Sequence, residues 1–220
     1  MTTCSSQCGC RQSADPSSPP LPAADIDSLL ERLVAEWHVV DPAHKAEELE
    51  GRICDLHKFN FQLWHEEDIA RSPEVTDARI AEVKRNIDRF NQARNDSIEK
   101  VDDWLVAELG RRQIEAPAGT PAATETPGSA VDRLSILELR RFHMREQIDR
   151  ADATREHREK AAARMAVLDA QRGHLIEALD RLLTEIFLGQ RPLRVFRMMK
   201  MYNDPSMNPY LYKAQGQAAA

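Results

Sequence analysis

The sequence predicts an all-α fold, an antiparallel bundle of about five helices. Apolar residues recur every three to four positions over most of the chain, and no segment alternates apolar and polar residues as a half-buried strand does. The periodic segments are separated by proline- or glycine-containing breaks. The 220 residues, 42% hydrophobic and 30% charged, suit one domain rather than a fibrous or wholly disordered chain.

Three helices are predicted in the first half. The first begins near Asp25, which can serve as its N-cap, and ends by Asp41-Pro42. The second covers about residues 43–71, because Ser72-Pro73 cannot continue it. The third starts between residues 74 and 77 and keeps its period to about Arg112.

A proline-rich linker near residues 115–128 separates these helices from two more. Ser129 and Asp132 resemble a capping box, so the fourth helix is expected to start there and to run to about Asp149. The fifth helix ends at Gly189. Residues 150–158 contain no helix breaker, so the sequence leaves open whether the fourth and fifth helices are one bent helix.

The two ends are expected to be irregular. Residues 1–24 form a Ser/Pro-rich tail, residues 25–212 the single bundle domain and residues 213–220 a second disordered tail. The domain ends in an irregular strap whose tyrosines should pack on the bundle: Tyr202, Tyr210 and Tyr212. The tail's C-x3-C-x-C cluster (Cys4, Cys8, Cys10) lacks a fourth zinc ligand, and Cys54 has the spacing of a core residue.

Composition restricts location and partners. The sequence holds no run of about 18 apolar residues and no secretory signal pattern, which predicts a cytoplasmic protein without a membrane span. A net charge of -6 offers no basic field for nucleic acid. The arginines of the bundle interior and of the strap suit a small anionic ligand, and the other expected partner is a protein.

Polar residues interrupt the apolar stripes of three helices. They stand where leucine is expected: Asn60, Glu67, Arg94 and Arg172. If the helices pack by these stripes, the four side chains converge, and Glu67 should pair with Arg94 or Arg172 because an unpaired buried charge is costly. A further apolar face that includes Trp64 makes the second helix the expected centre of the bundle.

These polar positions admit two interpretations. The first is a structural ion-pair network that fixes helix register; the second is a pocket for a ligand, for acid–base chemistry or for an oxygen-rich metal site using Glu67, Asp88 and Asn95. The sequence lacks the helical Glu-x-x-His motifs of di-iron bundles, the H-E-x-x-H motif, the P-loop and the G-x-S-x-G motif. Nearby arginines compete for the carboxylates of the oxygen-rich alternative, so the prediction names no cofactor and no metal-binding residue.

Five sequence blocks resemble the bacterial DUF4254 family: residues 60–71, 84–88, 91–99, 125–137 and 200–209. The resemblance implies a helical protein without an established activity and a link to envelope polysaccharide synthesis. The motif positions, together with Arg172 from the periodicity, form the candidate site: Asn60, Trp64, His65, Glu67, Asp68, Asp88, Asn91, Arg94, Asn95 and Arg172.

Two functional hypotheses follow. The first is a helical-bundle protein with a binding or accessory role, whose interior polar cluster is chiefly structural. The alternative is an enzyme, or a binding protein for an anionic small molecule such as a sugar phosphate, that uses the cluster as its site.

Overall fold

The computed structural model describes residues 17–197, 199 and 206–210. These residues form five helices and no strand: α1 (Ala23–Trp37), α2 (Glu48–Arg71), α3 (Asp77–Arg112), α4 (Pro127–Asp149) and α5 (Arg155–Phe187). The predicted all-α bundle is confirmed. No helix among the described residues is both long and apolar enough to cross a membrane.

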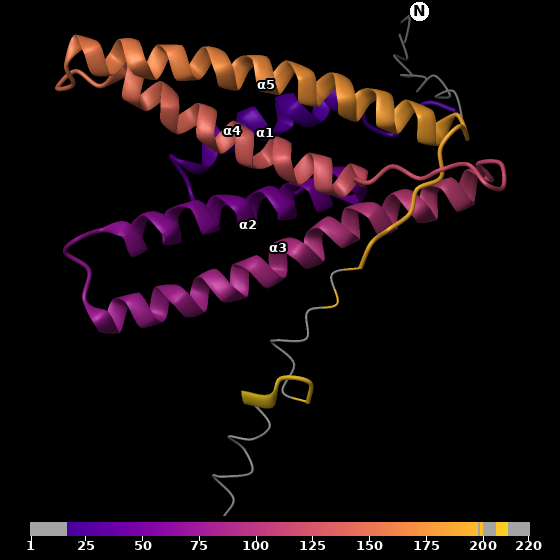
Figure 1. Ribbon diagram of the computed structural model, residues 1–220, viewed down its shortest axis with the longest axis horizontal. Coiled ribbons are helices and arrows are strands. Elements are labelled where there is room, and N and C mark those ends of the chain that lie inside the picture. The colour runs from indigo at the N-terminus through magenta and orange to yellow at the C-terminus, as the bar shows by residue number, and fades with distance from the viewer. Residues whose placement is uncertain (1–16, 198, 200–205, 211–220) are drawn as a thin grey trace, which may run out of the picture.

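The helices form two antiparallel hairpins, α2–α3 and α4–α5, with α1 behind and between them (Figure 1). α2 contacts α1, α3 and α4, as its two buried faces predict. α4, however, contacts all four other helices. The centre of the bundle is therefore α4, and the expectation that the second helix holds this position was wrong.

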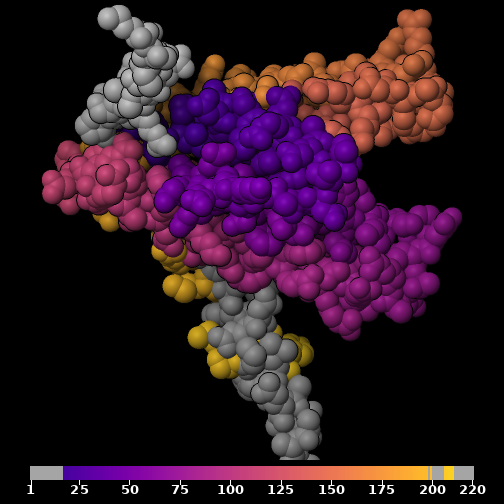
Figure 2. All heavy atoms as spheres, turned by 180° about the vertical axis from the view of Figure 1, so that it is seen from behind, coloured from indigo at the N-terminus to yellow at the C-terminus, as the bar shows by residue number. Residues whose placement is uncertain are grey.

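One main core joins all five helices. Its fully buried members include Leu30 of α1, Ile53 of α2, Leu105 of α3, Leu134 of α4 and Leu179 of α5. Beyond this core the hairpins diverge, and their tips project separately from the body (Figure 2). The divergence leaves room for hollows between the hairpins, where polar side chains gather.

The helix ends follow local chemistry, with three departures from the expected starts. α1 begins two residues before Asp25, and α2 begins at Glu48 rather than near residue 43. The N-cap of α4 is Thr126, whose hydroxyl accepts the Ser129 N–H, so the expected Ser129 capping box was wrong. At the other end of the hairpin, α5 ends just before Gly189, which has φ +67° as a helix terminator does.

α4 and α5 are separate helices. The chain turns between Asp149 and Arg155, and the Thr154 side chain caps α5 by accepting the His157 N–H. Residues 113–126 are the connection between α3 and α4, in the place predicted for the proline-rich linker.

The C-terminal strap is partly described. Residues 190–197 are irregular, and Arg197 forms ion pairs with Glu99 and Asp103 of α3. Tyr210 is 88% exposed, so the expectation that it packs on the bundle was wrong. The described residues do not include Tyr202, Tyr212, the N-terminal cysteine cluster or the segment 213–220, whereas Cys54 is buried in the core as expected.

Candidate functional site

A buried polar network joins α2, α3 and α4. Asn60 donates hydrogen bonds from Nδ2 to Asp132 Oδ1 (2.9 Å) and to Ser135 Oγ (2.9 Å). Arg94 donates two hydrogen bonds to the same Asp132 carboxylate. Its Nε lies 2.8 Å from Oδ1, and its Nη2 donates to Oδ2. This two-point contact matches the planar guanidinium to the planar carboxylate. Two of the four stripe outliers, Asn60 and Arg94, therefore meet at one acceptor.

The inner end of this network is closed to solvent. Ser135 is fully buried, and its hydroxyl oxygen lies 2.8 Å from Nδ1 of His57, which is also fully buried. Burial lowers the pKa of His57 to about 3, so the imidazole is neutral at physiological pH. The hydrogen bond to Asp132 raises the pKa of Arg94, which stays charged. The inner half is a fixed scaffold that no substrate can reach.

The outer end of the network opens into a cavity of about 490 Å³ between α2, α3 and α4. The volume lies within the usual range for small-molecule sites, about 300–1,000 Å³. Six of the ten candidate residues line it, together with two arginines and three apolar residues: Asn60, Trp64, Glu67, Asp68, Asn91 and Arg94, then Arg71 and Arg140, and Leu63, Ile136 and Leu139.

Several donors of this cavity have no partner within the described part of the chain. Arg140 is exposed and makes no hydrogen bond or ion pair there, and neither does the Asn91 amide. Arg94 uses Nε and Nη2 on Asp132, which leaves Nη1 without a hydrogen bond to any described residue. The half-buried Trp64 adds an aromatic surface beside these donors. The lining thus combines free cationic and amide donors with an aromatic wall.

The pairing expected for Glu67 was wrong. Glu67 forms an exposed ion pair with Arg71 of its own helix (2.9 Å), because Asp132 of α4 occupies the position next to Arg94. Asp88 is exposed and pairs with Lys84, so it lies outside the cavity, and Asn95 does not line it either.

Arg172 belongs to a second network, on the other side of α4. Its guanidinium binds the buried Asp27 of α1 through two nitrogens and lies 3.0 Å from Glu138 of α4. Arg141 then links Glu138 (2.6 Å) to Asp169 of α5 (2.8 Å). Burial raises the pKa of both Asp27 and Glu138, and the two arginines oppose that rise. Arg172 therefore does not converge with the other three outliers.

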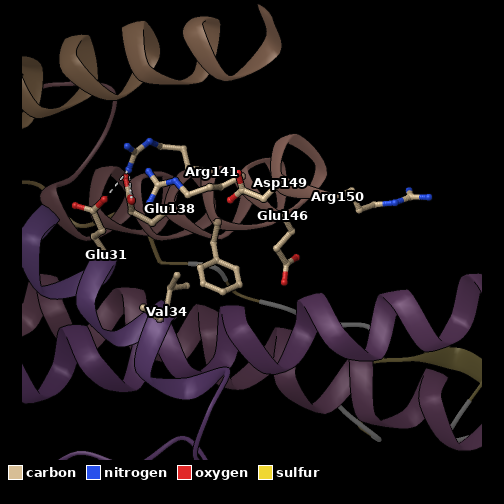
Figure 3. Close-up of a pocket in the computed structure, with 10 residues that line it drawn as sticks. Glu31, Val34, Glu138, Arg141, Glu146, Asp149 and Arg150 are labelled. Atoms are coloured by element: carbon tan, nitrogen blue, oxygen red, sulfur yellow. Dashed lines mark hydrogen bonds and ion pairs between the residues drawn. The ribbon is translucent and has the colours of Figure 1, made fainter. Parts of the chain in front are cut away.

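A hollow of about 470 Å³ adjoins this second network between α1 and α4. Figure 3 shows Glu31, Glu138 and Arg141 close together at one end and Arg150 extended away from them. The charges at the crowded end already satisfy one another, since Glu31 and Glu138 both pair with Arg141 and Arg172. This arrangement ties α1, α4 and α5 together at the crowded end of the hollow.

The candidate residue His65 lies outside the cavity, in a cluster with His38 and His143. Burial and the two neighbouring imidazoles lower its pKa. The three histidines are the one group among the described residues whose ring nitrogens could hold a metal ion. The sequence predicted no such group, because His38, His65 and His143 come from three different elements and show no ligand spacing.

One of three comparisons with known proteins finds a match. A family model described as "Protein of unknown function (DUF4254)" matches residues 50–195, a range that contains every residue of the cavity. A search of curated proteins and a search of solved structures each find no match. Since the match covers more than half of the chain, the protein belongs to the DUF4254 family.

Proposed function

We propose that this protein binds a small phosphorylated sugar, or a closely similar anionic polyol, in the cavity between α2, α3 and α4. The observation that carries the proposal is the set of free donors beside an aromatic wall: Arg140, Asn91 and Nη1 of Arg94 around Trp64. Guanidinium groups are the side chains best suited to phosphate, and they bind it with two parallel hydrogen bonds.

The remaining lining suits the rest of such a ligand. Asp68 and Glu67 offer carboxylate oxygens that accept hydrogen bonds from hydroxyl groups, and the indole of Trp64 offers a flat apolar face. The network behind the cavity holds Asn60 and Arg94 in fixed positions before a ligand arrives. A fixed set of donors reduces the entropy lost on binding.

The two hypotheses from the sequence thus apply to different halves of one network. The buried half, His57, Ser135 and Asp132, supports a structural role, since none of these side chains is accessible. The outer half supports a binding role. We place the binding role first because the free donors of the outer half have no structural explanation.

The test is a thermal-shift series with a hexose phosphate, the unphosphorylated hexose and inorganic phosphate. A ligand at 100 times its Kd stabilises the folded state by about 2.7 kcal/mol, which raises Tm by several degrees. We expect the hexose phosphate to give the largest shift.

Arg140→Gln should sharply reduce that shift. Its control is Arg164→Gln on α5, another exposed arginine without a partner among the described residues and outside every cavity mentioned above. Arg164→Gln should keep the wild-type shift. Equal shifts in both variants, or no response to the hexose phosphate at any concentration, would overturn the proposal.

A further inference from the structure

Three histidine side chains from distant parts of the chain converge between the hairpins. His38 follows α1 as its C-cap, His65 lies in α2 and His143 in α4. One ring nitrogen of each histidine lies within 4.8 Å of those of the other two. The convergence depends on the packing of three helices and lies outside the cavity proposed above for the phosphorylated sugar.

Within the described part of the chain, Nε2 is unpartnered in each of the three histidines, and in two of them Nδ1 is already hydrogen-bonded. Nδ1 of His38 is 2.6 Å from the Val34 carbonyl oxygen, and Nδ1 of His143 is 2.7 Å from Oε2 of Glu146. Each of these oxygens accepts a hydrogen bond from the Nδ1–H, which leaves Nε2 as an unprotonated nitrogen with a lone pair. Nε2 of all three histidines is buried and has no hydrogen-bond partner among the described residues.

Packing alone gives no reason for this arrangement. Three buried ring nitrogens without a hydrogen-bond partner among the described residues lose their hydration and gain nothing in return, so their burial costs free energy. Histidines in protein metal sites show the same pattern: one ring nitrogen binds the ion, and the other donates its N–H to a carboxylate or a backbone carbonyl. There the bond to the ion offsets the free energy lost when the nitrogen is buried. His38 has the carbonyl partner and His143 the carboxylate partner.

Aromatic rings hold the three imidazoles in place. Phe142 stacks on His38 with ring centroids 3.9 Å apart, and Trp64 stacks on His143 at 4.9 Å with nearly parallel planes. Phe61 contacts His65 edge-on at 4.4 Å. These rings restrict the rotation of the three imidazoles, which favours a fixed metal site.

We propose that His38, His65 and His143 form a three-histidine site for a divalent transition-metal ion, with Zn²⁺ as the best match. Neutral imidazole nitrogens suit zinc and its neighbours in the first transition series, whereas magnesium and calcium require oxygen ligands. In a tetrahedral site with Zn–N distances of about 2.0–2.1 Å, two ligand nitrogens lie about 3.3 Å apart. The histidine nitrogens lie within 4.8 Å of one another, so each pair would have to approach by about 1.5 Å at most to bind the ion.

Three protein ligands leave one position of a tetrahedral shell for a water molecule or another oxygen donor. The Glu146 carboxylate lies 2.7 Å from Nδ1 of His143, and its negative charge beside the cluster favours a bound cation. Glu146 and His143 also line a hollow of about 510 Å³, which gives the site a route to solvent.

The test measures zinc binding by competition with a coloured chelator, and cobalt binding by its visible absorption. The starting protein is the full chain with Cys4, Cys8 and Cys10 replaced by serine, because those thiols would bind zinc independently of the bundle. We expect one zinc ion per chain and a cobalt spectrum of a low-coordinate nitrogen site. No binding of either ion would overturn the proposal without any further variant.

Substitutions then assign the ligands. His38→Gln, His65→Gln and His143→Gln should each weaken zinc binding more than Glu146→Gln, an outer-shell change for which the expected loss is about 10- to 100-fold. The control is His174→Gln, which replaces an exposed histidine of α5. This variant should bind zinc as tightly as the starting protein does. Circular dichroism with chelator present checks that each variant is folded.

The assignment would be overturned if His174→Gln lost as much zinc affinity as the three cluster variants. It would also be overturned if His38→Gln, His65→Gln and His143→Gln all bound zinc as tightly as the starting protein. A thermal shift with a hexose phosphate on metal-free protein tests the cavity separately, so the two proposals can fail independently.

Discussion

Arg94 illustrates what a charged residue in an apolar stripe requires. Its guanidinium is about one-quarter exposed and meets a carboxylate, Asp132, that is 7% exposed. Removing one partner of such a pair leaves a buried charge without compensation. This change destabilises a protein more than replacing both partners by apolar residues does.

Arg94→Met should therefore lower the free energy of unfolding by about 3 kcal/mol. Arg85→Met, at an exposed position of the same helix without a partner among the described residues, should change it by less than about 0.5 kcal/mol. Urea unfolding of both variants measures the difference. Equal stability of the two would show that the Asn60–Arg94–Asp132 network adds nothing to the fold.

Asp102 is a buried carboxyl whose effect depends on pH. It is 1% exposed and accepts the Gly128 N–H at 2.7 Å, and burial raises its pKa from 3.8 to about 6 despite that hydrogen bond. Between about pH 4 and pH 6 the folded state binds more protons at Asp102 than the unfolded state does. Its contribution to stability therefore falls as the pH rises through this window, by at most about 1.4 kcal/mol per pH unit.

Asp102→Asn removes this titration but keeps an oxygen for the Gly128 N–H. We expect the stability of the variant, relative to wild type, to increase between pH 4 and pH 6 and then to level off. Urea unfolding across this range measures it, with Asp180→Asn on the exposed face of α5 as the control. A wild-type curve parallel to that of Asp102→Asn would contradict the assignment.

At the residue scale the sequence identifies polar interior positions better than their partners. Asn60 and Arg94 interrupt apolar stripes, and both enter a network. Their common acceptor, Asp132, was assigned to a helix cap because its position resembles a capping box. Its burial depends on how α4 is rotated against α2 and α3, which no local pattern encodes.

At the scale of elements, sequence predicts helices well and their ends less well. The apolar period sets the length of α3 at 36 residues, in agreement with the structure. The break between α4 and α5 was left open because it contains neither proline nor glycine. A threonine decides it: Thr154 adopts the extended conformation of an N-cap and accepts the His157 N–H.

The start of α4 docks on α3 at Gly128. A Cβ atom there would lie 2.6 Å from the Ile98 carbonyl oxygen and 2.9 Å from the Asp102 side chain, so the two helices approach as closely as they do only because residue 128 has no side chain.

Gly128→Ala should destabilise the protein by about 1–3 kcal/mol, since the backbone must shift to relieve the clash. Gly173→Ala is the matched control. Nothing lies within 4 Å of a Cβ atom at this mid-helix position of α5, so the change should stabilise by about 0.5–1 kcal/mol. Thermal unfolding of both variants gives the signs. A neutral Gly128→Ala would contradict the close docking of α4 on α3.

At the scale of the whole molecule, function depends on how the two hairpins are placed. Helix periodicity indicates which face of each helix is buried but not which helices meet. Arg172 was grouped with Arg94 on that basis, and the structure places the two on opposite sides of α4. His38 and His143 are brought together only by tertiary packing, which explains why the sequence did not predict a metal site.

The cavity and the histidine cluster are neighbours. Trp64 lines the cavity and stacks on His143, and Trp64, Asp68 and Arg140 also line the hollow that reaches His143. A ligand in the cavity would therefore contact the aromatic wall of the histidine cluster. Trp64 is the residue that reports most directly on this region.

The central claim, a ligand site between α2, α3 and α4, is tested most directly by the three tryptophan indole N–H resonances of the metal-free, ¹⁵N-labelled protein during titration with a hexose phosphate. Trp37 and Trp104 are internal controls, because their indoles are hydrogen-bonded to Ala43 and Glu48 away from the cavity. We predict a saturable shift of the Trp64 resonance, assigned with Trp64→Phe, while the other two stay fixed. A titration that leaves Trp64 unmoved, or that moves only Trp37 or Trp104, would contradict the claim.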